Sequence, residues 1–186
     1  MIRTDGVMNM SHYGERIDES TVRFERMLPG PIERVWEYLT DGDKRGTWLA
    51  AGKTELRVGG KVELHFHNAS LSKQPDVDPP EKYRDLPETM SFGGTVTRCQ
   101  PVSLLAYTWD FEDEHSEVCF ELEAVGEQVR LVLTHRRLSS YDEIISVSGG
   151  WHTHLDILDD VLSGREPPAF WKTHTPIEAE YERRFA

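Results

Sequence analysis

The sequence predicts an α+β fold in which one long helix near the C-terminus packs on a curved antiparallel sheet of about seven strands. Trp151, Leu155, Leu158 and Leu162 recur at helical spacing, and Gly164 is placed to end that helix. Upstream lies a series of segments that alternate apolar and polar residues, with no comparable helix to cover them. A sheet with one apolar face needs a covering layer, so the long helix is predicted to lie on it.

Length and charge limit the class of protein. A chain of 186 residues is most simply one domain, large enough for a core and a cavity. Its 33 acidic and 21 basic residues give a formal net charge of −12, which argues against nucleic acid or an anionic membrane surface as the main partner. No apolar run approaches a membrane span and no signal-peptide core precedes the domain, so we expect a cytoplasmic protein.

The strands are predicted from segments in which every second residue is apolar. In the most regular of them, Val118, Phe120 and Leu122 are expected to face inward between exposed glutamates. In the first of them, Val22, Phe24 and Met27 are expected to be partly buried. The predicted strands cover residues 21–28, 55–58, 61–67, 94–99, 104–110, 116–123 and 129–135.

Two short helices are predicted after the first strand. Pro31 sits where a helix begins, and Ile32, Val35, Trp36 and Leu39 follow at helical spacing. A second helical piece is predicted over residues 43–48, and residues 141–147 are expected to lead into the long helix.

Four segments organise the chain. Residues 1–19 are expected to form a flexible tail, and residues 20–164 the domain. Within the domain, the proline-rich residues 69–91 are predicted to form an insertion, a flexible flap at the mouth of a pocket. Residues 165–186 form a second tail, in which a short helix is predicted to begin at Pro176. Its apolar side, made by Ile177, Tyr181 and Phe185, must dock on the domain or on a partner.

Cysteines and histidines do not indicate a metal site. Cys99 and Cys119 are placed on the first and third strands of a meander, about 10 Å apart, so reduced thiols are expected. Neither has a second ligand at the spacing that zinc sites use. His65 and His67 share the polar face of one strand, without an evident third ligand, and are interpreted as solvated.

Taken together, these segments resemble the bacterial homologues of the activator of heat-shock-protein-90 ATPase, within the SRPBCC (START-like, helix-grip) superfamily. The resemblance covers roughly residues 21–164 and leaves the proline-rich insertion unmatched. Its motifs are Phe24-Glu25-Arg26, Pro31-Ile32-Glu33-Arg34-Val35-Trp36, Leu39-Thr40-Asp41, Trp48-Leu49, Val58-Gly59-Gly60, Val62-Glu63-Leu64, Gly94-Thr95-Val96, Leu105-Ala106-Tyr107-Thr108-Trp109, Leu133-Thr134-His135 and Gly149-Gly150-Trp151-His152, with Leu155, Leu158 and Leu162.

The resemblance implies a helix-grip fold: a seven-stranded antiparallel sheet wrapped around the long C-terminal helix, with two short helices after the first strand. In many members of the superfamily the cavity between helix and sheet binds small apolar molecules. Others are cyclases or related enzymes. The eukaryotic namesake stimulates a chaperone ATPase through protein surfaces whose counterparts are not recognisable in this sequence.

The leading hypothesis is a binding protein that encloses an apolar, aromatic or lipid-like small molecule. Large apolar side chains with a few polar groups are what such a pocket uses, although the same rings could simply fill a closed core. Neither a cofactor nor a metal is expected, because no phosphate-binding glycine loop or metal-ligand set occurs. The predicted ligand-binding residues are Trp48, Phe66, Trp109, Phe120, Leu133, His135, Trp151, His152 and Leu155.

Two alternatives belong to other classes. A protein-interaction module would have a filled interior and an exposed apolar surface, for which the side of the tail helix is a candidate. A cyclase or hydrolase would use His135 and His152 as acid and base if both reached the pocket, with Asp156 orienting His152. No catalytic residue is assigned, because no nucleophile, metal set or acid pair accompanies the two histidines. A homodimer is also compatible with the sequence.

Overall fold

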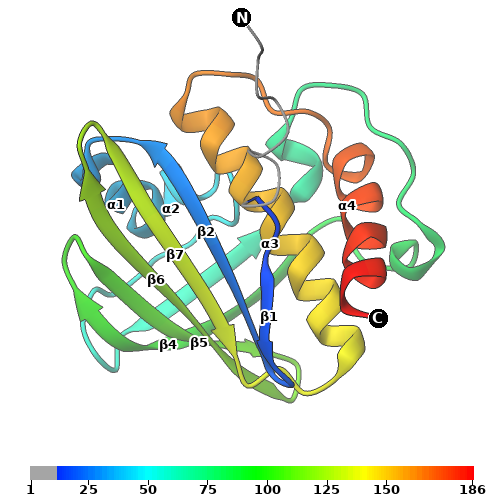
Figure 1. The fold of residues 1–186 in the computed structure, drawn as a ribbon, viewed down its shortest axis with the longest axis horizontal. Helices are drawn as coiled ribbons and strands as arrows, with labels where there is room; N and C mark the ends of the chain where they lie inside the picture. The colour runs from blue at the N-terminus through cyan, green and yellow to red at the C-terminus, as the bar shows by residue number, and fades with distance from the viewer. Residues whose placement is uncertain (1–11) are drawn as a thin grey trace, which may run out of the picture.

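A computed structural model describes residues 12–186 and shows a curved antiparallel sheet wrapped against one long helix (Figure 1). The seven strands follow the spatial order β1-β2-β7-β6-β5-β4-β3. The predicted fold class is therefore confirmed. The strands are β1 (Glu15–Asp18), β2 (Thr21–Pro29), β3 (Lys61–Phe66), β4 (Met90–Gln100), β5 (Leu104–Phe111), β6 (Glu114–Val125) and β7 (Gln128–Arg136).

Helices cover one side of the sheet. The long helix α3 lies against it, and α4 packs beside α3 (Figure 1). The two short helices lie between β2 and β3, as predicted, although the second ends at residue 45, with turns over residues 46–48. The helices are α1 (Ile32–Thr40), α2 (Gly42–Arg45), α3 (Tyr141–Leu162) and α4 (Phe170–Phe185), with the 3₁₀ turns η1 (Asn68–Leu71) and η2 (Glu81–Tyr83) in the insertion.

Alternation along the strands decides which residues reach the core. On β2, Val22, Phe24 and Leu28 are buried, as is Arg26, which shares their face. Met27 lies on the opposite face and is 42% exposed, so its predicted burial is wrong. The same alternation buries the three predicted apolar residues of β6.

The seventh strand is not the predicted one. Residues 15–18 of the expected tail form β1, which pairs with β2, while residues 1–11 lie outside the described part of the chain. Residues 55–58 form no strand. The chain beside β3 makes only isolated bridges, at Ala51 and Thr54, and then turns through Gly59, whose φ of +82° suits glycine.

The long helix is longer than predicted. Residues 141–147 belong to α3 itself, because Ser140 caps its start by accepting a hydrogen bond from the backbone N–H of Glu143. Gly164 follows the C-terminus with φ +70°, which confirms its predicted place.

The helix of the C-terminal tail, α4, begins at Phe170 rather than at Pro176, which lies inside it. The helix continues through this proline because α4 is held by packing on α3, which outweighs the local stop signal. Gly149 makes the close approach possible: a Cβ there would lie 3.0 Å from Cβ of Glu178 and 3.3 Å from Nε2 of His174.

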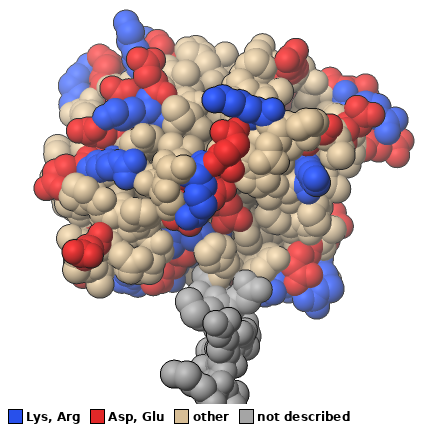
Figure 2. Space-filling view, turned by 90° about the horizontal axis from the view of Figure 1, so that it is seen from above, with Lys and Arg blue, Asp and Glu red and all other residues tan. Residues whose placement is uncertain are grey.

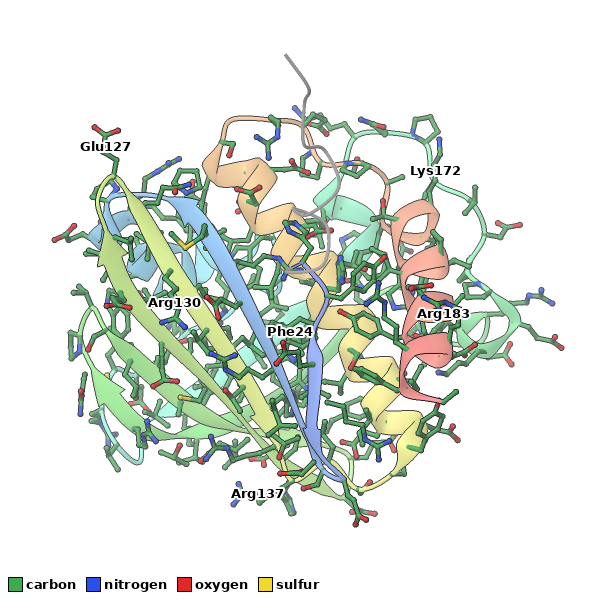
Figure 3. The ribbon with its side chains drawn as sticks, in the orientation of Figure 1. Phe24, Glu127, Arg130, Arg137, Lys172 and Arg183 are labelled. Atoms are coloured by element: carbon green, nitrogen blue, oxygen red, sulfur yellow. The ribbon has the colours of Figure 1, made fainter. Side chains whose placement is uncertain are left out.

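Charged side chains occupy the outer surface of the sheet. Arg130 on β7 donates to the carboxylate of Glu25 on β2 at 2.8 Å, on the side of the sheet away from α3 (Figure 3). Figure 2 shows acidic and basic side chains interspersed on another face of the molecule. Cys99 on β4 and Cys119 on β6 are free thiols with β5 between them, as predicted. Within residues 12–186 no helix is long and apolar enough to cross a membrane.

Candidate functional site

A cavity of about 370 Å³ lies between α3, α4 and the β3–β4–β5 half of the sheet. Its walls are mainly apolar and aromatic, with a small number of polar side chains. They are formed by Leu49, Phe66, Asn68, Lys82, Tyr83, Leu86, Met90, Phe92, Trp109, Phe111, His135, Ser146, Val147, Gly150, Trp151, His154, Phe170, Trp171 and His174.

One face of α3 forms a wall of this cavity. Val147, Gly150, Trp151 and His154 recur at spacings of three and four, so they share that face. Gly150 contributes open space, because a Cβ there would meet no side chain or neighbouring backbone within 4 Å. The pair of glycines therefore has two uses: Gly149 admits α4, and Gly150 leaves room in the cavity.

Trp109 is the centre of the aromatic wall. Its ring centroid lies 5.1 Å from that of Trp151, 5.0 Å from Phe92 and 5.9 Å from Phe66. The last two contacts are edge-to-face, the arrangement in which aromatic pairs attract. Trp109 thus joins α3 to β3 and β4 at the cavity surface.

His135 is held by hydrogen bonds on both ring nitrogens. The indole N–H of Trp151 donates to Nδ1 at 2.9 Å, and Nε2 lies 2.7 Å from the hydroxyl of Ser116. Because an indole can only donate, Nδ1 is unprotonated and Nε2 carries the hydrogen. Complete burial lowers the pKa of His135 to about 3. The neutral ring of His135 therefore links Trp151 to Ser116 by hydrogen bonds, and it has no free nitrogen for acid–base chemistry.

Two other histidines of the cavity wall each have a ring nitrogen without a hydrogen-bond partner among the described residues. Nδ1 of His154 lies 2.8 Å from the backbone carbonyl of Trp48, so it donates and carries the hydrogen. Nδ1 of His174 is buried without a hydrogen-bond partner, while its Nε2 lies 3.5 Å from a carboxylate oxygen of Glu178. Burial lowers the pKa of each histidine to about 4, so both are neutral at pH 7.

The insertion contributes to the wall of the cavity. The hydroxyl of Tyr83 donates to Glu178 on α4 at 2.5 Å and lies 2.6 Å from the hydroxyl of Ser146 on α3. The ammonium of Lys82 lies 3.1 Å from the other oxygen of Glu178. The ring of Tyr83 also stacks on Trp171 at 5.3 Å. Segment 81–83 is therefore attached to both helices.

The structure brings four of the nine predicted site residues together. Phe66, Trp109, His135 and Trp151 all lie in the cavity wall. The other five are buried behind it or on another side of α3. Phe120, for example, contacts the ring of Trp151 from the core side at 5.7 Å. The five that do not line the cavity are Trp48, Phe120, Leu133, His152 and Leu155.

His152 belongs to a separate buried cluster. It follows Trp151, so the helical turn of about 100° directs it toward α4 and β2 instead of the cavity. Its Nδ1 lies 2.8 Å from the hydroxyl of Tyr181, and its Nε2 lies 3.4 Å from Asp156. Arg26 lies 3.5 Å from the same carboxylate. Asp156 lies beside the ring of His152, as predicted. The predicted pairing of His152 with His135 in one pocket is wrong, because His152 does not line the cavity.

The apolar side of the tail helix is covered by its own domain. Tyr181 is fully buried, and its hydroxyl accepts a hydrogen bond from the backbone N–H of Gly14 at 2.7 Å. Ile177 and Phe185 are partly buried against the core. The exposed surface that a protein-interaction module would present there is absent from the described chain. Within residues 12–186 no three His, Cys, Asp or Glu side chains gather as a metal site would need.

The sequence contained signals for some of the residues that were missed. His154 follows Trp151 by three positions and Gly150 by four, so helical spacing alone places it on the cavity face. Phe170, Trp171 and His174 were missed because the tail helix was predicted to begin after them. No local pattern indicates that Tyr83 reaches α3 and α4, since that contact joins residues more than 60 positions apart.

Comparison with known proteins defines the class. Residues 29–163 match the family described as activator of Hsp90 ATPase homolog 1-like protein. The chain belongs to this family, which lies within the SRPBCC superfamily, and the predicted resemblance is confirmed. No match was found among curated proteins.

Solved structures agree with this placement. The solution structure of a Bordetella parapertussis protein is 45% identical, with a TM-score of 0.76, over 92% of this chain and 90% of that one. CalU16 from Micromonospora echinospora is 23% identical, with a TM-score of 0.65 over 88% and 86% of the two chains. A protein of unknown function from Enterococcus faecalis is 22% identical, with a TM-score of 0.65 over 92% and 90%. The last two show the shared fold.

Proposed function

We propose that this protein is a cytoplasmic binding protein that encloses a small apolar molecule, aromatic or lipid-like, between α3 and the sheet. The observation that carries the proposal is the cavity of about 370 Å³ with the aromatic cluster around Trp109 in its wall. Cavities of this size, mostly apolar and with a few polar groups, are typical of small-molecule sites. Gly150 supports the proposal, because a larger residue would fill space that the fold leaves open.

An enzyme that uses His135 and His152 fits the geometry less well. His135 has both nitrogens engaged, and His152 faces the other side of α3. Within the described chain, Ser146 of the cavity wall is bonded to the hydroxyl of Tyr83 and forms no hydrogen bond with the remaining cavity histidines, His154 and His174. Binding is therefore the function that the arrangement supports best.

Native mass spectrometry of protein purified without detergent tests the proposal first. A reproducible additional mass that disappears on denaturation would support it and would also report whether the chain is a homodimer. Titration with the fluorescent apolar probe phenylnaphthylamine adds a test that does not need a co-purified ligand. We expect saturable binding in the native chain and weaker binding in Trp109→Ala, which removes the centre of the aromatic wall. Absence of saturable probe binding in the native, folded protein would overturn the proposal.

A further inference from the structure

Some polar atoms of the cavity wall have no hydrogen-bond partner in the described chain, and their chemistry indicates which groups a ligand would carry. Nδ1 of His154 is committed to the carbonyl of Trp48, which leaves Nε2 with a lone pair. None of the described residues forms a hydrogen bond with that Nε2. His154 is only 5% exposed and lies in the cavity wall, so a group inside the cavity is the natural partner of this atom.

Two further unpaired acceptor atoms belong to residues of the wall, but both are fully buried. Nδ1 of His174 is buried without a partner, and its Nε2 faces Glu178, which also receives hydrogen bonds from Tyr83 and Lys82. A carboxylate opposite Nε2 favours the hydrogen on Nε2, which leaves Nδ1 as an acceptor. Oδ1 of Asn68 is likewise buried without a hydrogen-bond partner. Among the unpaired acceptors that these described wall residues carry, Nε2 of His154 is therefore the one that a donor inside the cavity could reach.

Cationic groups are scarce at this wall. Lys82 is the one Lys or Arg among the cavity-lining residues of the described chain, and its ammonium is paired with Glu178 at 3.1 Å. The histidines that line the cavity are neutral at pH 7 for the reasons given above. A carboxylate or phosphate inside the cavity would face acceptor atoms without an unpaired positive charge, which is unfavourable for a desolvated anion.

The surroundings of His154 suit a ring. Its centroid lies 5.3 Å from that of Phe170 and 6.2 Å from that of Phe66. Aromatic side chains therefore flank the His154 ring from the sheet and from α4. A planar ligand seated among them would bring a substituent at its edge to the unpaired Nε2 of His154.

Resting on the proposed binding function, we infer that the ligand is a neutral aromatic molecule with a hydroxyl group, whose O–H donates to Nε2 of His154. His154 is thus the specificity-determining residue of the cavity. The hydroxyl satisfies an acceptor that apolar analogues would leave buried and unpaired, and this difference is the basis of selection.

Displacement of phenylnaphthylamine by a series of naphthalene derivatives tests the inference. Naphthol carries the O–H, methoxynaphthalene keeps the oxygen without the hydrogen, naphthalene has neither, and naphthoate is an anion. We expect naphthol to displace the probe at a concentration about tenfold lower than methoxynaphthalene or naphthalene, as one well-placed buried hydrogen bond provides. Naphthoate should be the weakest competitor.

His154→Asn is the matching variant. The asparagine amide N–H can replace the Nδ1 donor to the carbonyl of Trp48, but it leaves no acceptor at the position of Nε2. We expect the advantage of naphthol to fall to about onefold while naphthalene still binds. His67→Asn, at a partly exposed histidine outside the cavity lining, is the control and should keep the preference. The comparison of naphthol with methoxynaphthalene uses the native chain, so it remains decisive if His154→Asn does not fold.

The outcomes separate the inference from the function on which it rests. If phenylnaphthylamine and naphthalene bind but naphthol has no advantage, the binding function stands and the hydroxyl selection is overturned. Preference for naphthoate would overturn the inference as well, and would point to Lys82 instead. If no member of the series and no probe binds the folded protein, the proposed function itself fails.

Discussion

The indole nitrogen of Trp151 on α3 donates a hydrogen bond of 2.9 Å to Nδ1 of His135 on β7, and both side chains are buried. This bond joins the long helix to the centre of the sheet. It also fixes the tautomer of His135, whose Nε2–H then faces Ser116. A polar contact with every atom satisfied inside an apolar core gives α3 one defined position on the sheet.

His135→Leu should lower the free energy of unfolding by about 2 kcal/mol or more. The substitution leaves the indole N–H of Trp151 and the hydroxyl of Ser116 without partners, and each orphaned buried group costs about 1–3 kcal/mol. Urea denaturation measures the change. The control His65→Leu, at an exposed position, should stay within about 0.5 kcal/mol of the native chain. Equal stabilities of the two variants would show that the Trp151–His135 bond is not stabilising.

Stability should decrease on the acid side of pH 6.5. The pKa of His135 is lowered to about 3, and those of His154 and His174 to about 4, by burial. In the unfolded chain they bind protons near pH 6.5, so the unfolded state takes up more protons as the pH falls from 6.5 toward 4. Each such histidine contributes a slope of up to about 1.4 kcal/mol per pH unit.

Urea midpoints measured from pH 7.5 down to pH 5 test this dependence. The three variants that each remove one of these histidines should show a shallower slope below pH 6.5. A slope that does not change in any of them would contradict the assignment of neutral buried rings.

The two neighbouring glycines of α3 should respond oppositely to alanine. Gly149→Ala places a Cβ 3.0 Å from Cβ of Glu178, so Glu178 on α4 must give way by a few tenths of an ångström, and we expect a cost of about 1 kcal/mol. Gly150→Ala meets nothing within 4 Å and gains helix propensity, worth about 0.5–1 kcal/mol. Thermal unfolding of the two variants measures the difference. A lower melting temperature for Gly150→Ala than for Gly149→Ala would refute the assigned packing.

Tyr83→Phe should accelerate release of a bound probe. The variant keeps the ring on Trp171 but loses the hydrogen bonds to Glu178 and Ser146 that attach the insertion to α4 and α3. Stopped-flow dilution of phenylnaphthylamine measures the dissociation rate, and we expect an increase of about threefold to tenfold. Tyr141→Phe, at an exposed tyrosine, is the control. Unchanged release in Tyr83→Phe would mean that segment 81–83 does not limit escape.

The fold could be predicted from sequence because its determinants are local and periodic. Alternation on β6 and helical spacing on α3 identify their buried faces, and Gly164 marks the end of the helix. β1 could not be predicted, since residues 15–18 are all exposed and owe their structure to pairing with β2. The start of α4 was predicted wrongly at Pro176 for a related reason. The helix includes this proline because it is stabilised by packing on α3, which is a contact between separate segments.

The cavity was less predictable than the fold. Trp109 and Trp151 follow from face assignments, whereas Phe120 and Leu133 share those faces and lie in the core. Which inward residues border empty space depends on how α4 and the insertion close around it. Tyr83 and His174 take part through contacts between distant segments, and periodicity contains no information about them.

Binding of phenylnaphthylamine to Gly150→Leu, compared with Gly150→Ala and the native chain, tests the central claim most directly. A leucine side chain at this position projects into the open space beside Trp151 and occupies it. A Cβ at residue 150 meets no atom within 4 Å, so we expect the variant to fold. Fluorescence titration should show saturable binding in the native chain and in Gly150→Ala, and loss of at least about tenfold in affinity in a folded Gly150→Leu. Equal affinity in all three proteins would place the probe outside the cavity and contradict the proposed function.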